Sequence, residues 1–120
     1  MSTRESESAD DVSLLRAVSN GNRDAFQSLY ERHAAVLLSL ALKILGTRVD
    51  AEDVLQDTFP QVWSTADSYD GRRAKPLGWL IMLTRSRAID RLRSRSTRVR
   101  ITESVAQESR VLTALPAQAL

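Results

Sequence analysis

Apolar side chains recur every three or four residues along most of this chain, which is the spacing of one buried face of an α-helix. The clearest case is a helix predicted from about 23 to 45, where Gly46 favours a stop because glycine readily adopts a left-handed conformation. Its apolar positions are Phe26, Leu29, Tyr30, Val36, Leu37, Leu40, Ala41, Ile44 and Leu45. No stretch alternates between apolar and polar residues for the length of a strand. The pattern therefore predicts an all-α protein.

A short helix is predicted before this one and a third helix after it. The first covers about 11–19, and the Asn-Gly-Asn sequence that follows provides a stop and then an N-cap for the next helix. The third begins at Asp50, with Asp53 three residues later in the position of a capping box. Pro60 falls inside this helix, where a proline removes one backbone hydrogen bond, and it predicts a kink before Val62.

A fourth helix is predicted from Pro76 or Leu77 to about Arg95, since proline is well tolerated in a first turn. Gly71 and Pro76 interrupt the pattern before it, so residues 67–76 are expected to form a loop. Both ends of the chain lack a clear helical period. The expected organisation is a disordered tail at 1–10, a bundle of about four helices at 11–95, and a linker or weakly helical tail at 96–120, with any helix there around 103–115.

Composition limits the chemistry that this chain can perform. It has 120 residues, no cysteine and a single histidine, His33, which excludes thiolate metal sites and argues against a Ser/His triad. We expect no cofactor, no metal and no enzymatic activity, and we assign His33 no role beyond a surface position. The longest apolar run is interrupted by Lys43 and is too short to span a bilayer, and the N-terminus does not resemble a signal peptide. A cytoplasmic protein without a membrane partner is expected.

The net charge of +2 hides a strong asymmetry between the two halves of the chain. Residues 1–60 carry six Lys and Arg against ten Asp and Glu, whereas residues 61–120 carry eleven against five. Seven arginines and one acid fall between Arg85 and Arg100. Such a division favours an anionic partner for the second half and a basic partner for the first.

Acidic side chains gather at the start of the third predicted helix. Asp50, Asp53 and Asp57 follow one another at i, i+3 and i+7 and therefore share a face, with Glu52 and Gln56 beside it. Carboxylates in a first turn stabilise a helix by roughly 0.3–1 kcal/mol each through its dipole, which accounts for all of them except Asp57. A docking surface for a basic partner is the alternative, and the residues alone do not decide between the two.

Three blocks of this sequence resemble a known family. They are DAFQSLYERH at 24–33, DAEDVLQDTFPQVW at 50–63 and SYDGRRAKPLGWLIMLTRSRAIDRLRSR at 68–95. In their order and spacing they resemble region 2 of the extracytoplasmic-function (ECF) sigma factors, which are promoter-specificity subunits of bacterial RNA polymerase. The resemblance implies a four-helix region whose third helix binds the clamp helices of the largest polymerase subunit. It places the clamp-binding residues at Asp53, Gln56 and Asp57.

The resemblance also implies a second partner, the non-template DNA strand of the promoter −10 element. Family members capture an unstacked base in the loop before the fourth helix and hold adjacent bases and phosphates with that helix. The loop of this chain agrees, because it offers Tyr69 for stacking beside Arg72 and Arg73. The expected DNA-binding residues are Ser68, Tyr69, Arg72, Arg73, Lys75, Ser86, Arg87, Asp90, Arg91 and Arg93. Ser86 stands where an asparagine is common in the family, and Trp79 either stacks on DNA or, as its apolar face favours, belongs to the core.

Alternatives to this interpretation stay open. The family's second DNA-binding domain, region 4, reads the −35 element and has no counterpart after Ser96, so either a fragment or a natural variant is expected. A helical interaction module that is sequestered by an anti-sigma factor is one alternative function. A regulator that binds duplex DNA through its arginines is another, although such a protein would have no use for the three clamp-binding residues together.

Overall fold

The computed structural model describes the backbone of residues 3–114 and the side chains of residues 9–106. Helices make up almost all of this part of the chain, which contains no strand. Its elements are α1 (Thr3–Ser19), α2 (Arg23–Leu45), α3 (Arg48–Thr65), the short 3-10 helix η1 (Ala66–Ser68) and α4 (Pro76–Ala114). The prediction of an all-α bundle of about four helices is confirmed. No helix within residues 3–114 combines the length and the apolar content needed to cross a membrane.

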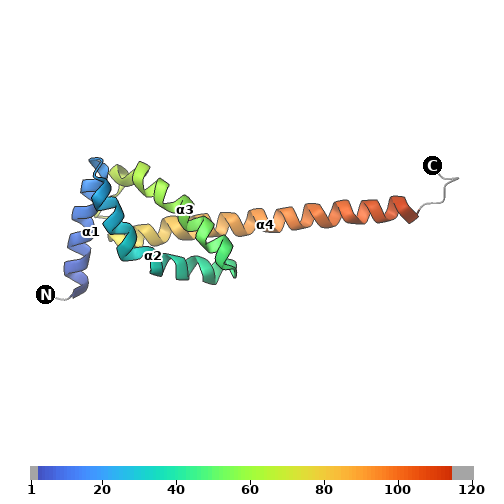
Figure 1. The fold of residues 1–120 in the computed structure, drawn as a ribbon, viewed down its shortest axis with the longest axis horizontal. Helices are drawn as coiled ribbons and strands as arrows, with labels where there is room; N and C mark the ends of the chain where they lie inside the picture. The colour runs from blue at the N-terminus through green and yellow to red at the C-terminus, as the bar shows by residue number, and fades with distance from the viewer. Residues whose placement is uncertain (1–2, 115–120) are drawn as a thin grey trace.

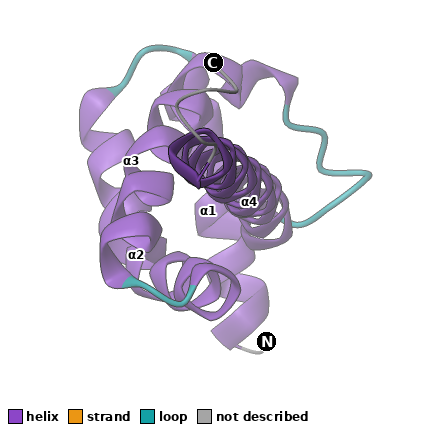
Figure 2. Ribbon diagram, turned by 90° about the vertical axis from the view of Figure 1, so that its right-hand side faces the viewer, coloured by secondary structure: helices purple, strands orange, loops and turns teal. Residues whose placement is uncertain are grey.

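The first three helices pack around the first half of α4. The second half of α4 projects away from them (Figure 1). Viewed along α4, the longest loop, between η1 and α4, stands clear of the helices (Figure 2). This loop and the outer surface of α4 are therefore both accessible.

The ends of α2 lie where the sequence predicts them. The side chain of Asn22 accepts a hydrogen bond from the backbone N–H of Ala25 at 3.0 Å, and Gly46 adopts a left-handed conformation with φ of 80°. In this conformation the backbone N–H of Gly46 donates to the carbonyl of Leu42 at 2.8 Å. The two hydrogen bonds satisfy backbone groups that the helix ends would otherwise leave unpaired. Local sequence is sufficient here because each cap depends only on residues within one turn.

The predicted start of α3 is wrong by one turn. The N-cap is Thr47, whose hydroxyl accepts from the backbone N–H of Asp50 and donates to the Asp50 carboxylate at 3.0 Å. Asp50 is therefore the third residue of the helix instead of its cap. Its carboxylate is also engaged by arginines of α4, a long-range contact that the local pattern does not contain.

Both outer helices are longer than the sequence pattern predicts. α1 begins at Thr3 instead of about residue 11, and α4 continues to Ala114 instead of ending near Arg95. After Gly78 the sequence of α4 contains no glycine or proline before Pro116, so no residue interrupts the helix once it has started. The apolar period fades because the second half of α4 has no helix to pack against.

The core of the bundle lies between all four helices. Trp79 is buried in it, as its apolar face favours, whereas Trp63 remains 36% exposed and packs edge-to-face against Phe26. The fully buried aliphatic side chains include Leu15, Leu29, Leu37, Leu80, Val18, Val54 and Val62. α3 is continuous through Pro60, which is exposed. The carbonyl that loses its donor belongs to Gln56, an exposed residue.

The expectation that His33 is a surface residue is wrong. His33 is only 7% exposed, and its Nε2 lies 2.8 Å from Oδ2 of Asp11 in α1. Asp11 is 2% exposed and also accepts a hydrogen bond from Nη1 of Arg32 at 3.0 Å. Two adjacent residues of α2 thus hold a buried carboxylate of α1. The sequence pattern missed this contact because it treats polar residues as surface residues.

Candidate nucleic-acid interface and acidic face

Tyr69 is the first residue of the loop between η1 and α4, and its side chain bonds to the other end of that loop. Its hydroxyl donates to the carbonyl of Ala74 at 2.6 Å, and its ring packs edge-to-face against Trp79 with centroids 5.5 Å apart. Burial raises the pKa of the Tyr69 hydroxyl above its usual value. The ring is therefore held in a fixed orientation on the core, with part of its surface exposed.

The predicted basic residues of this loop point into solvent. The side chains of Arg72 and Arg73 are 93% and 88% exposed, and Lys75 is also exposed. Asp70 accepts from the backbone N–H of Arg72 at 2.9 Å and from its Nε at 3.2 Å. These bonds lower the pKa of the Asp70 carboxyl. Asp70 thus shapes the turn and leaves most of the arginine donors available.

A hollow of about 300 Å³ lies between this loop and α1. Its floor includes Leu15 and Ala66, which are buried, and the Tyr69 side chain also lines it. Its other lining residues are Val12, Arg16, Ser19, Asp67 and Gly71. An apolar floor beside an aromatic ring, with a cation and a carboxylate at the surface, suits a planar heteroaromatic group. Sequence reasoning missed the contribution of α1, because nothing in its local pattern reveals that it faces the loop.

The acidic face of α3 is partly neutralised by α4. Nη2 of Arg91 donates to Asp50 at 2.8 Å and to Asp53 at 2.9 Å, and Nη1 of Arg95 donates to Asp50 at 2.8 Å. The hydrogen bond from Arg91 is the main reason why the pKa of Asp50 falls to about 2. Arg95 also donates to the carbonyl of Leu45. The arginines therefore join α4 to the end of α2 and the start of α3.

This network predicts a loss of stability in acid. Since the folded-state pKa of Asp50 lies below its ordinary value of 3.8, its ionised form contributes stability above about pH 4, and that contribution is lost as the pH falls toward 2. We expect Asp50→Asn to flatten the dependence of the urea unfolding midpoint on pH between 5 and 2.5. Asp57→Asn is the matched control, because Asp57 forms no ion pair among the described residues. Equal pH profiles for wild type and Asp50→Asn would contradict this role of Asp50.

The three residues predicted to bind polymerase lie in different surroundings. Asp53 is tied to Arg91, whereas Gln56 and Asp57 are exposed. Gln56 borders a groove of about 320 Å³ between α2 and α3, which Tyr30 and other apolar side chains also line. Asp57 borders a second groove, of about 260 Å³, between α3 and α4. α3 therefore presents accessible polar groups toward both of its flanks.

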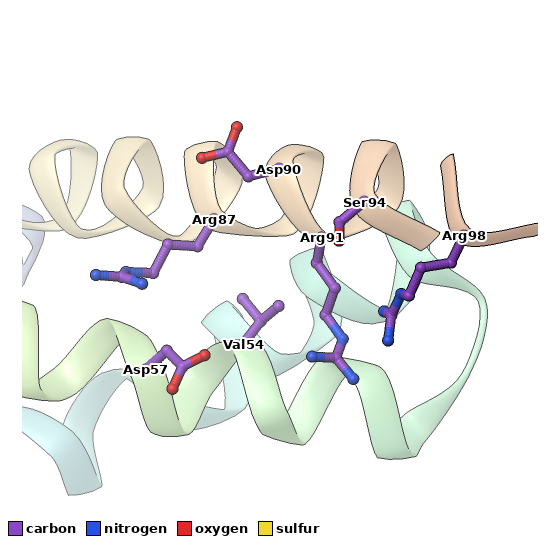
Figure 3. A pocket seen from close by; sticks show the side chains of 7 residues that line it. All are labelled: Val54, Asp57, Arg87, Asp90, Arg91, Ser94 and Arg98. Carbon is purple, nitrogen blue, oxygen red and sulfur yellow. The ribbon is translucent and has the colours of Figure 1, made fainter. Parts of the chain in front are cut away.

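The residues of α4 predicted to bind DNA divide between two sides of the helix. Ser86, Asp90 and Arg93 are exposed and lie within one sector of the helix. Figure 3 shows Asp90 pointing away from α3, while Arg87 and Arg91 point toward it. Nε of Arg87 donates to the side chain of Gln61 at 2.6 Å. Three of the five residues, Ser86, Asp90 and Arg93, therefore lie together on the exposed side of α4. The other two, Arg87 and Arg91, bond to side chains of α3.

The candidate surfaces contain no evident metal site. Within the described side chains, no group of three or more acidic or histidine residues is placed to hold an ion. The candidate binding features of these surfaces are the hollow beside Tyr69, the exposed cations on the loop and on α4, and the exposed polar groups on α3.

Comparison with known proteins identifies the family of this chain. The family described as Sigma-70 region 2 matches residues 29–98. The chain belongs to this family. Region 2 here is 34% identical over 87 residues to the ECF RNA polymerase sigma factor SigK of Mycobacterium ulcerans (strain Agy99), and 38% identical over 81 residues to that of Mycobacterium sp. (strain KMS). These matches cover 72% and 68% of this chain but 46% and 42% of the relatives, so the chain spans less than half of their length.

A solved structure shares the fold of region 2. The NMR structure of an engineered region 2 of sigmaE in complex with GTAAAA is 27% identical and superposes with a TM-score of 0.66. The match covers 73% of this chain and 90% of that one. The resemblance to region 2 of the ECF sigma factors is therefore confirmed, whereas the individual binding residues remain predictions.

Proposed function

We propose that this chain acts as region 2 of an ECF sigma factor in transcription initiation. In this role α3 binds the clamp of the largest subunit of core RNA polymerase, and the loop after η1 captures a base of the −10 non-template strand. The observation that carries the proposal is the hollow beside Tyr69, which lies next to exposed cations in a chain of this family. The related sigmaE region 2 was solved with a short DNA sequence.

The hollow and the loop residues that follow it offer the two interactions that base capture requires. The fixed ring of Tyr69 offers a stacking surface, and base–aromatic stacking is worth about 1–3 kcal/mol. Arg72 and Arg73 can neutralise the phosphates on either side of the captured base. Together these contacts offset the few kcal/mol that unstacking a base costs. The proposed DNA contacts also include Ser68, Lys75, Ser86, Asp90 and Arg93.

The proposed polymerase contact uses the accessible part of α3. Gln56 and Asp57 offer an amide and a carboxylate to a basic partner, and Asp53 joins them although one of its oxygens is already bonded to Arg91. The chain would act without catalysis, in the cytoplasm where transcription occurs. An anti-sigma factor that regulates it would have to cover one or both of these surfaces.

Binding of a labelled GTAAAA oligonucleotide to the full chain tests the base-capture step. We expect Tyr69→Ala to weaken binding about tenfold, which corresponds to the loss of one stacked base, as measured by fluorescence anisotropy. Tyr69→Phe is the matched control, because it keeps the ring and loses only the hydrogen bond to Ala74. A hexathymidine oligonucleotide of equal charge reports on sequence selectivity. Equal affinities of wild type and Tyr69→Ala would rule out capture beside this ring.

A further inference from the structure

The second half of α4 has no neighbour in the bundle. It projects beyond the other helices (Figure 1), and every residue from 96 to 105 is exposed. Ile101 is 59% exposed and Val105 is 56% exposed, although isoleucine and valine are among the residue types most often buried. In proteins most of the stability of a helix comes from packing an apolar face against a neighbour. The projecting half of α4 therefore presents apolar side chains that the bundle leaves uncovered.

These apolar residues follow the spacing of a coiled coil. Positions 98, 101, 105 and 108 recur every three and four residues, as the a and d positions of a heptad do, and they fall within a sector of about 80°. The adjacent positions 97, 102 and 104 carry only small hydroxyl side chains, so they do not obstruct a second helix. We call the first set the α4 seam; it consists of Arg98, Ile101, Val105 and Glu108.

The charges of the α4 seam are complementary to those of a second copy in the reverse orientation. In an antiparallel pair whose twofold axis passes beside position 103, Ile101 of each copy lies level with Val105 of the other. Arg98 of each copy then lies level with Glu108 of the other, so two apolar layers are flanked by two layers of opposite charge. A parallel pair would instead place Arg98 against Arg98 and Glu108 against Glu108, and like charges across an interface repel. The seam thus favours one orientation and disfavours the other.

The two bundles leave room for this pairing. In the same register, residue 95 of one copy lies level with residue 111 of the other, so the two residues 95 are about 24 Å apart along the helix axis. Within the described side chains, Arg95 is the last residue of α4 that bonds to α2 or α3. Each bundle therefore lies at its own end of the paired segment.

From these observations we infer that two copies of this chain associate through an antiparallel pairing of the projecting halves of α4. The seam fits a second copy because it is complementary to itself, in the manner of a twofold-symmetric interface. The contact lies apart from the loop after η1 and from the exposed polar groups of α3, so it does not depend on the proposed function. It covers the apolar side chains of the segment that the bundle leaves unpacked.

Sedimentation equilibrium of the full chain at several concentrations tests this pairing. We expect a reversible equilibrium between monomer and dimer. Arg98→Glu places two glutamates in each outer layer and Glu108→Arg places two arginines there, so each substitution should weaken dimerisation about tenfold. The two substitutions together exchange the charges within each layer and should restore the dissociation constant of the wild type. In a parallel dimer all four proteins would associate equally, because each would keep like charges opposite one another.

Arg100→Glu is the matched control for Arg98→Glu. It makes the same change in net charge two positions away, on a side of the exposed helix outside the α4 seam, and neither arginine forms an ion pair among the described residues. A wild-type chain that stays monomeric at every concentration would overturn the inference, as would equal effects of Arg98→Glu and Arg100→Glu. A double substitution that dimerises as weakly as either single one would contradict the antiparallel register.

Discussion

Reversing the charge at Asp57 is expected to weaken binding of this chain to core RNA polymerase at least tenfold. Asp57 is exposed and unpaired among the described residues, and it lies beyond the first turn of α3, where the helix dipole gives it little structural role. Asp57→Arg replaces an attraction to a basic clamp surface by a repulsion, and like charges across an interface cost several kcal/mol. Mycobacterial core polymerase immobilised on a biosensor surface would measure the change.

Asp24→Arg is the control for this substitution. Asp24 is an exposed acid in the first turn of α2, so the same change in net charge occurs away from α3. Asp53 is less suitable, because replacing it would also release Arg91 from one of its acceptors. If both charge reversals reduce the affinity equally, the effect comes from the overall charge of the chain, and the proposed contact at Asp57 is wrong.

Replacing Asp11 by alanine is expected to destabilise the fold by about 2–4 kcal/mol, since removing one partner of a buried ionic contact leaves the other groups uncompensated. The carboxylate is almost completely buried and accepts from Arg32, with His33 beside it. Urea unfolding followed by circular dichroism would measure the loss. α1 should also lose its place beside the loop, so binding of the GTAAAA oligonucleotide should weaken together with stability.

Asp11→Asn separates the charge of this residue from its shape. The amide keeps the size of the side chain and an oxygen that can accept from Arg32, so we expect a smaller loss than for alanine. Equal and small losses for both substitutions would show that the buried contact does not hold α1 in place.

The local features of the fold follow from residues that act within one turn. Asn22 and Gly46 delimit α2 in the sequence and in the structure, and Pro76 begins α4, because caps and breakers need no distant partner. The position of Tyr69 in a loop beside basic residues could be predicted for the same reason. The hollow next to it could not, since half of its lining comes from α1.

The surroundings of two polar residues differ from those that the local pattern predicts. His33 was expected at the surface and is buried, because a carboxylate more than twenty positions away supplies its partner. Asp50 was predicted as a helix cap, yet its carboxylate is the acceptor for Arg91 and Arg95, about forty positions along the chain. Periodicity measures only whether a residue is apolar, so it cannot identify polar groups that are buried in pairs.

The sequence by itself determined that the chain is helical, the two ends of α2 and the membership of the family, since each depends on short-range pattern or on blocks of matching residues. It also predicted a loop at 67–76, of which the structure keeps 69–75 as loop and places Asp67 and Ser68 in η1 and Pro76 in α4. Only the tertiary structure decided which charges are available to a partner. Packing α4 against α3 brings Arg91 to Asp53 and leaves Arg93 exposed, although the two arginines lie only two positions apart. The reason is geometric: residues two apart on a helix point in different directions, and only a packed neighbour makes one direction the interior.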